Sequence, residues 1–179
     1  SYTVTATVSD EVGNAASPLT SSFFKVDSQL PVINSITFEW GNTLNATEDD
    51  VSQNVTVVTT GIEAGQELTV RLDGSDYTGV VTDNSAVVII PPEKLQSLTN
   101  DVSYTVTATV SDEAGNTVST ESSNFFTVDS QLPVINDISF SWGATLNASD
   151  DDVSQNVTVT TTGVEAGQEL TVTLDGSGF

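Results

Sequence analysis

The chain contains no cysteine, no histidine and no methionine among its 179 residues. It therefore lacks a thiol nucleophile, an imidazole base and the usual ligands of zinc and iron–sulfur sites. The absence of cysteine also excludes disulfide bonds, so cysteine usage does not reveal the redox compartment. Only three residues are lysine or arginine, against 25 aspartate and glutamate, which gives a formal net charge of −22. Such a chain repels nucleic acids and anionic membrane surfaces.

The sequence also has no initiator methionine, no signal peptide and no apolar run near the ~20 residues that a membrane-spanning helix needs. We therefore expect a soluble chain that is part of a longer protein. Disorder is disfavoured despite the high charge, because 37% of the residues are hydrophobic and they alternate with threonine and serine. That alternation predicts β-strands rather than helices.

An internal repeat dominates the sequence. Residues 1–77 align with residues 103–179 without a gap, at a period of 102 residues and with 58 identities in 77 positions. A period near 100 residues is too long for a solenoid and matches one autonomous domain of a tandem array. The polar stretch at 27–31, which ends in proline, marks the boundary. It predicts the C-terminal part of a preceding repeat at 1–26, a complete repeat at 27–128 and the N-terminal half of a following repeat at 129–179.

The complete repeat is predicted to be an immunoglobulin-like β-sandwich. Seven short alternating segments, separated by turn signals, are typical of that fold. Asp73 precedes a glycine and predicts a tight hairpin turn, Tyr104 is placed like a corner tyrosine, and Trp40 shares its strand face with two other core residues. Neither partial copy contains an equivalent of residues 78–102, so neither should form a complete core alone. The predicted fold class is all-β, with tandem immunoglobulin-like domains of about seven strands each.

A family resemblance is carried by residues 104–116, which read YTVTATVSDEAGN, and by the Val-Asp pair at the repeat boundary, followed by Leu-Pro at 132–133. These motifs resemble the bacterial immunoglobulin-like repeats of giant RTX-type and biofilm-associated surface adhesins, and the resemblance covers the whole chain. It implies extender repeats that act as spacers, an extracellular location on a Gram-negative cell surface, secretion of the parent protein by a type I system, and Ca²⁺ at or near the domain junctions. No glycine-rich RTX nonapeptide occurs in the chain.

The excess of carboxylates offers oxygen ligands of the kind that Ca²⁺ prefers. No EF-hand loop is present, so a site would have to be assembled from loops that meet at the two ends of each sandwich. Two carboxylates ~4 Å apart at an effective dielectric constant near 20 repel by about 4 kcal/mol, and a cation between them would remove that repulsion. The candidate ligands are Asp27, Glu63, Asp112, Glu113 and Asn116 at the N-terminal end of the complete repeat, Glu48, Asp49, Asp50, Asp101 and Asp129 at its C-terminal end, and Asp10 in the first copy.

A second interpretation is that these acids are solvated loop residues that keep a long filament soluble. Asp73 and Asp175 are explained by the tight turns that they begin. The alternating threonines at 3–7 and 105–109 could form an ice- or sugar-binding face, but one row of three is too narrow for it. The exposed acids lack the aromatic-lined cleft of a glycosidase, and we expect no enzymatic activity.

Two functions are consistent with the sequence. The first is a structural extender of an adhesin, stiffened by Ca²⁺, that projects a distal ligand-binding region from the cell. The second is a recognition module in which each immunoglobulin-like domain binds a host protein or a glycan. The expected partners are the neighbouring repeats of the same chain. The two partial copies add the possibility that residues 129–179 of one molecule pair head-to-tail with residues 1–26 of the next.

Overall fold

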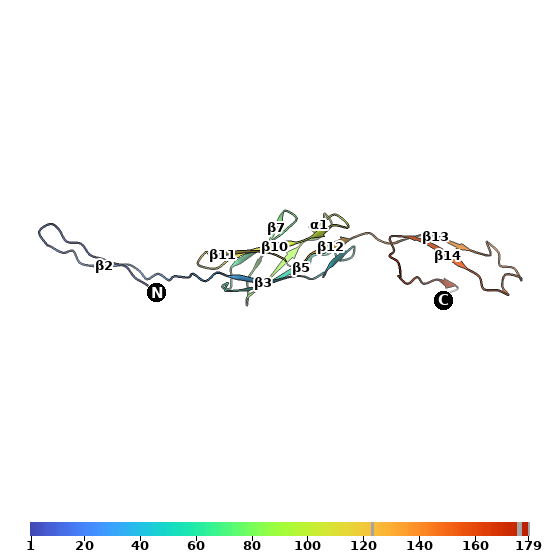
Figure 1. Cartoon of the computed structure of the whole chain (residues 1–179), viewed down its shortest axis with the longest axis horizontal. Helices are drawn as coiled ribbons and strands as arrows, with labels where there is room; N and C mark the ends of the chain where they lie inside the picture. Colours follow the sequence, from blue (N-terminus) through green and yellow to red (C-terminus); the bar gives the residue numbers. More distant parts are fainter. Residues whose placement is uncertain (123, 175–176, 179) are drawn as a thin grey trace.

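The computed structural model describes residues 1–122, 124–174 and 177–178. A β-sandwich occupies the middle of the molecule, and the N-terminal hairpin and the C-terminal segment lie on opposite sides of it along the long axis (Figure 1). The three parts of the chain are therefore arranged in sequence order, one after another.

Two antiparallel sheets form the central sandwich. Their strands alternate between buried and more exposed residues, as the period-2 pattern predicts, and the two sheets together confirm the predicted all-β immunoglobulin-like fold. The first sheet has the strand order β3 (Val32–Phe38), β5 (Gln53–Thr60) and β8 (Ser85–Ile90), and the second has β11 (Thr117–Glu121), β10 (Val106–Ser111), β6 (Glu67–Leu72) and β7 (Ser75–Val80).

A small third sheet joins strands from the beginning and the end of the sandwich. Strand β12 (Phe126–Asp129) lies between β4 (Thr43–Asn45) and β9 (Ser103–Tyr104), parallel to β4 and antiparallel to β9. The pairing places Thr127 opposite Thr43. Strands β4 and β11 were not expected from the sequence, because both are short and rich in polar residues.

The core lies inside the sandwich and includes side chains from the two main sheets, the small third sheet and helix α1, with residues that run from Ile33 to Val128. Phe126 is at its centre, with ring centroids of Phe38, Trp40 and Tyr104 at 5.1, 5.0 and 5.8 Å. Trp40 is buried as predicted, although it lies in the turn after β3 rather than in the strand. The Tyr104 hydroxyl accepts a hydrogen bond from the Thr99 backbone N–H at 2.8 Å, as expected of a corner tyrosine.

One turn and one helix meet beside β6. The turn between β6 and β7 has Asp73 at φ 42° and Gly74 at φ 80°, the left-handed conformation that the sequence predicts for an Asp-Gly hairpin. Lys94, in the short helix α1 (Pro92–Leu95), donates to the Asp73 carbonyl at 3.0 Å and to its carboxylate at 2.7 Å. The equivalent turn at Asp175 lies outside the described residues.

The flanking copies have strands but exposed apolar side chains. The N-terminal hairpin pairs β1 (Thr5–Ala6) with β2 (Leu19–Thr20), and Tyr2 packs on Phe24 at a ring distance of 5.7 Å. The C-terminal copy pairs β13 (Val134–Phe140) with β14 (Val157–Thr162) and β15 (Thr173–Leu174) with β16 (Ser177–Gly178).

Candidate metal centre at the repeat junctions

The loop between β10 and β11 is organised by one carboxylate at the N-terminal end of the sandwich. The Asp112 side chain is 4% exposed and accepts hydrogen bonds from the Asn116 backbone N–H and from Asn116 Nδ2, both at 2.8 Å. The Asn116 side chain is the main reason why the pKa of Asp112 lies below its ordinary value of 3.8. Asp10 makes the same two bonds to Asn14 at 2.7 Å in the first copy, and its pKa is lowered for the same reason.

The linker into the complete repeat crosses this loop. Asn116 Nδ2 donates to the Gln29 carbonyl at 3.3 Å, and the Gln29 N–H donates to the Asp27 carboxylate at 3.0 Å. Nearby, the Glu63 carboxylate accepts a hydrogen bond from the Glu113 N–H at 2.9 Å. The contacts bring Glu63 to the 112–116 loop and Asp27 to the adjoining linker, at the end where the sequence placed them.

A capping arrangement occupies the loop after β4 at the opposite end of the sandwich. Asn45 Oδ1 accepts from the backbone N–H groups of Thr47 and Glu48 at 2.9 and 3.1 Å, and the Glu48 carboxylate accepts from the Asn45 N–H at 3.0 Å. In the C-terminal copy Asn147 and Asp150 make the same reciprocal contacts. This use of the Glu48 and Asp150 carboxylates was not predicted.

The other candidates at this end are dispersed. Asp49 is 7% exposed, and its burial, with a smaller effect of the neighbouring Asp50 charge, raises its pKa above the usual 3.8. Asp50 accepts a hydrogen bond from Gln96 Nε2 at 2.8 Å, Asp101 accepts one from Asn100 Nδ2 at 2.9 Å, and Asp129 receives a long one of 3.4 Å from the Gln131 N–H.

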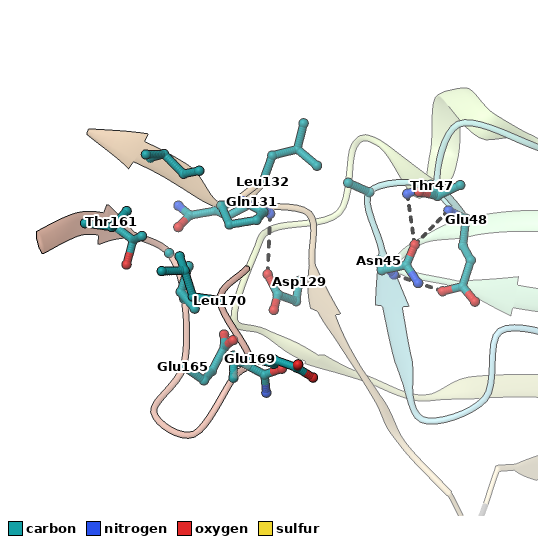
Figure 2. Close-up of a pocket in the computed structure, with 17 residues that line it drawn as sticks. Asn45, Thr47, Glu48, Asp129, Gln131, Leu132, Thr161, Glu165, Glu169 and Leu170 are labelled. Atoms are coloured by element: carbon teal, nitrogen blue, oxygen red, sulfur yellow. Dashed lines mark hydrogen bonds between the residues drawn. The ribbon is translucent and has the colours of Figure 1, made fainter. Parts of the chain in front are cut away.

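A hollow of about 940 Å³ lies at the junction between the sandwich and the C-terminal copy. Its apolar lining includes Ile135, Val159 and Leu170, whose counterparts in the complete repeat are buried in the core. The hollow is thus the uncovered inner side of a half-repeat rather than a shaped ligand pocket. Its acidic residues belong to both sides of the junction, with Glu48 from the sandwich, Asp129 from the linker, and Glu165 and Glu169 from the next copy (Figure 2).

The oxygen types at both junctions suit a hard cation such as Ca²⁺. Within the described part of the chain, however, no three acidic side chains are gathered closely enough to hold a metal ion. Several carboxylates already accept hydrogen bonds from protein N–H groups, which a pattern of acidic residues cannot reveal. Sequence reasoning also missed Glu165 and Glu169, although the signal was present, because they repeat the positions of Glu63 and Glu67.

The two sheets and the repeated linker define the class of this chain, a tandem-repeat protein of immunoglobulin-like β-sandwiches. No protein-family model and no curated protein matches it. Among the residues that the structure describes, no helix is long and apolar enough to cross a membrane.

Similar solved structures are parts of adhesins and of a large adhesion protein. One is an immunoglobulin-like domain from the M. primoryensis ice-binding adhesin, with 30% identity over 53% of this chain and 96% of that chain, at a TM-score of 0.41. Another belongs to a Ca²⁺-stabilised adhesin that helps an Antarctic bacterium to reach out and bind ice (28% identity, 90% of this chain, 40% of that chain, TM-score 0.47). A third is a tetra-tandem repeat in the extending region of a large adhesion protein (20% identity, 92% and 45%, TM-score 0.44).

One of these structures is described as an immunoglobulin-like domain and another as part of an extending region, the two kinds of adhesin segment that the sequence resembles. The chain spans less than half the length of the second and third structures.

Proposed function

We propose that the chain is a spacer segment of a bacterial surface adhesin, located outside the cell, with residues 27–128 as its repeating unit. The observation that carries the proposal is the 102-residue repeat, whose successive copies follow one another along the long axis of the molecule (Figure 1). Length grows with every copy of such a unit, whereas recognition needs only one site at the end. We further propose that the segment has no enzymatic activity, that it does not contact the membrane directly, and that it belongs to a Gram-negative bacterium.

Small-angle scattering of arrays with one, two and three complete repeats tests the spacer role. A spacer adds a constant increment to the maximum dimension with each repeat. The recognition alternative is tested with glycan arrays and host-cell binding of the same proteins. Saturable, specific binding by a single repeat would contradict the spacer role and support the recognition module instead.

The finer part of the proposal is that Ca²⁺ binds at the junctions and stiffens them. Its support is chemical, since Asp27 and Asp129 belong to short linkers and Asp129 lines a hollow with Glu48, Glu165 and Glu169. In addition, an adhesin that resembles this chain is described as Ca²⁺-stabilised. Asp129, Glu165 and Glu169 would hold the ion at the second junction, and Asp27 and Glu63 at the first. Asp112, Glu113 and Asn116 would complete the first site, while Asp49, Asp50, Asp101 and Asp10 are the remaining proposed ligands.

Thermal melting in Ca²⁺ and in EDTA tests this part. A site with a dissociation constant of ~10⁻⁴–10⁻³ M, as in extracellular modules, adds about 1–3 kcal/mol at 10- to 100-fold excess of the ion. Asp27→Asn should reduce that gain. Asp76→Asn is the matched control, because Asp76 lies on β7 and pairs with Arg71. An unchanged midpoint on addition of Ca²⁺ to the unmodified chain would rule out the stabilising ion.

The head-to-tail pairing of two molecules is also proposed, and the complete repeat supplies its geometry. There β10 pairs with β6, with Val106 opposite Leu72, so the copies would place Val4 of one molecule opposite Leu174 of the next. Such a composite lacks the counterparts of β8 and α1, so we expect association only at high concentration. Sedimentation that shows a monomer over the whole concentration range contradicts this pairing.

A further inference from the structure

Asn116 connects a buried carboxylate to the linker that precedes the complete repeat. Its Nδ2 carries two hydrogens, and the structure uses both, one for Asp112 Oδ2 at 2.8 Å and one for the Gln29 carbonyl at 3.3 Å. Asp112 Oδ1 also accepts the Asn116 backbone N–H at 2.8 Å. The carboxylate therefore holds the asparagine at two points and leaves its second N–H directed at the linker backbone.

The opposite end of the repeat has a similar arrangement, in which the asparagine accepts a hydrogen bond from the linker instead of donating one. Asn100 Nδ2 donates to the Asp101 carboxylate at 2.9 Å, and Asn100 Oδ1 accepts the N–H of Ser130, in the following linker, at 2.8 Å. Asp101 is itself anchored, since its N–H donates to the Val128 carbonyl at the end of β12 at 2.8 Å. Here too a carboxylate orients an asparagine, and the asparagine bonds to linker backbone.

The two contacts are made to different linkers of the chain, and the repeat period shows that they fall on neighbouring positions of the same linker type. Ser130 has the repeat position of Ser28, one residue before Gln29, and Gln131 has that of Gln29. We propose that Asn100 and Asn116 are positioning residues that clamp each linker between successive repeats without a metal ion. The upstream repeat holds the serine N–H and the downstream repeat holds the glutamine carbonyl, on adjacent residues.

In each linker the proline lies against a glycine of the downstream repeat. A Cβ placed on Gly61 would lie 3.6 Å from Pro31 Cα, and one on Gly163 would lie 3.6 Å from Pro133 Cα. Both glycines have left-handed backbones, with φ 77° and 71°. Because both copies show this contact, the linker proline belongs to the downstream repeat. The part of the linker that is left between two repeats is then the serine and the glutamine.

The clamp would stiffen the proposed spacer without Ca²⁺. The hydrogen bonds themselves do not depend on the proposed function, but their role in stiffness rests on it. The clamp also gives Asp101 and Asp112, two of the proposed Ca²⁺ ligands, a role in the ion-free chain, where their carboxylates orient the asparagine side chains.

Backbone ¹⁵N relaxation of the full chain in EDTA tests the clamp. The order parameters of Gln29 and Ser130 should be close to the rigid value of about 0.85 in the unmodified chain and fall below about 0.6 when the clamp is removed. Asn116→Ala should lower the value at Gln29 only, and Asn100→Ala the value at Ser130 only. Asn14→Ala is the matched control, because Asn14 makes the same loop contacts to Asp10 in the first copy.

Core amides such as those of Val57 and Ala108 report whether each variant is folded. Three results overturn the clamp: unchanged order parameters in the folded variants, an equal effect of Asn14→Ala, or a mobile linker in the unmodified chain. The last measurement needs no variant. Since EDTA is present throughout, a failure of the proposed Ca²⁺ site leaves the outcome unaffected.

Discussion

At the scale of single residues, Gly79 is required by a close approach between strands β7 and β8. A Cβ at this position would lie 2.6 Å from the Val87 carbonyl oxygen and 2.9 Å from Val88 Cγ2, and the backbone oxygen cannot move aside. We predict that Gly79→Ala lowers the free energy of unfolding by about 1–3 kcal/mol, as in other overpacked sites. Urea denaturation measures it, with Thr78→Ala on the exposed face of β7 as the control, and equal midpoints for the two variants would contradict the close approach.

Asp49 separates the two interpretations of the acidic loops. Its pKa is raised by burial and by Asp50, so its contribution to stability is present at pH values below 3.8 and is lost as the pH rises through the folded-state pKa. In EDTA we therefore predict that Asp49→Asn stabilises the protein at pH 7 and has no such effect at pH 3. If Asp49 is a Ca²⁺ ligand, the same variant gains less stability from added Ca²⁺ at pH 7 than the unmodified chain does. Thermal melts under the three conditions give the answer.

The positions of several residues followed from sequence, but their partners did not. The burial of Trp40 was predicted correctly from the alternation, although the residue lies just after its strand, and the corner position of Tyr104 was predicted correctly from its place at the start of a strand. Asp112 and Asn116 were placed in the right loop as metal ligands, whereas the structure shows them bonded to each other. Such a bond depends on side-chain rotamers and loop geometry, which a residue pattern does not encode.

At the scale of elements, helix α1 is attached to the β6–β7 turn by Lys94. The Lys94 side chain is only 11% exposed and makes two hydrogen bonds to Asp73, which has a left-handed backbone. We predict that Lys94→Met costs about 1 kcal/mol, a value reduced because the Asp73 side chain is half exposed. Arg71→Met is the control and should cost less than about 0.5 kcal/mol, since both side chains of its ion pair are more than half exposed. Similar losses in urea denaturation would refute the attachment.

Long alternating strands were easier to predict than short ones. Strand β10 has three apolar residues that alternate with polar ones, and its inward face was predicted correctly. Strand β4 has only three residues and one buried side chain, and its pairing with β12 spans more than 80 positions of sequence. A contact at that distance depends on the closed sandwich and leaves no local signal.

At the scale of the whole molecule, the core formed by the described residues is confined to one of the three parts of the chain. The cooperative unfolding enthalpy should therefore reflect about 100 residues, or about 70 kcal/mol near 60 °C, rather than the about 125 kcal/mol expected for 179 residues. Differential scanning calorimetry at low protein concentration measures it. An enthalpy near the larger value would mean that the terminal copies contribute packed structure of their own.

The parallel pairing of β12 with β4 has a mechanical consequence. Tension applied through the two linkers pulls β12 toward its C-terminus, while β4 and β3 are pulled back toward the N-terminus. The ladder between β4 and β12 is then sheared along its length, and so is the ladder between β3 and β5. In shear the hydrogen bonds of a ladder are strained together, whereas a hairpin pulled open at its end loses them one at a time. The repeat is thus built to resist stretching along the axis on which its copies are joined.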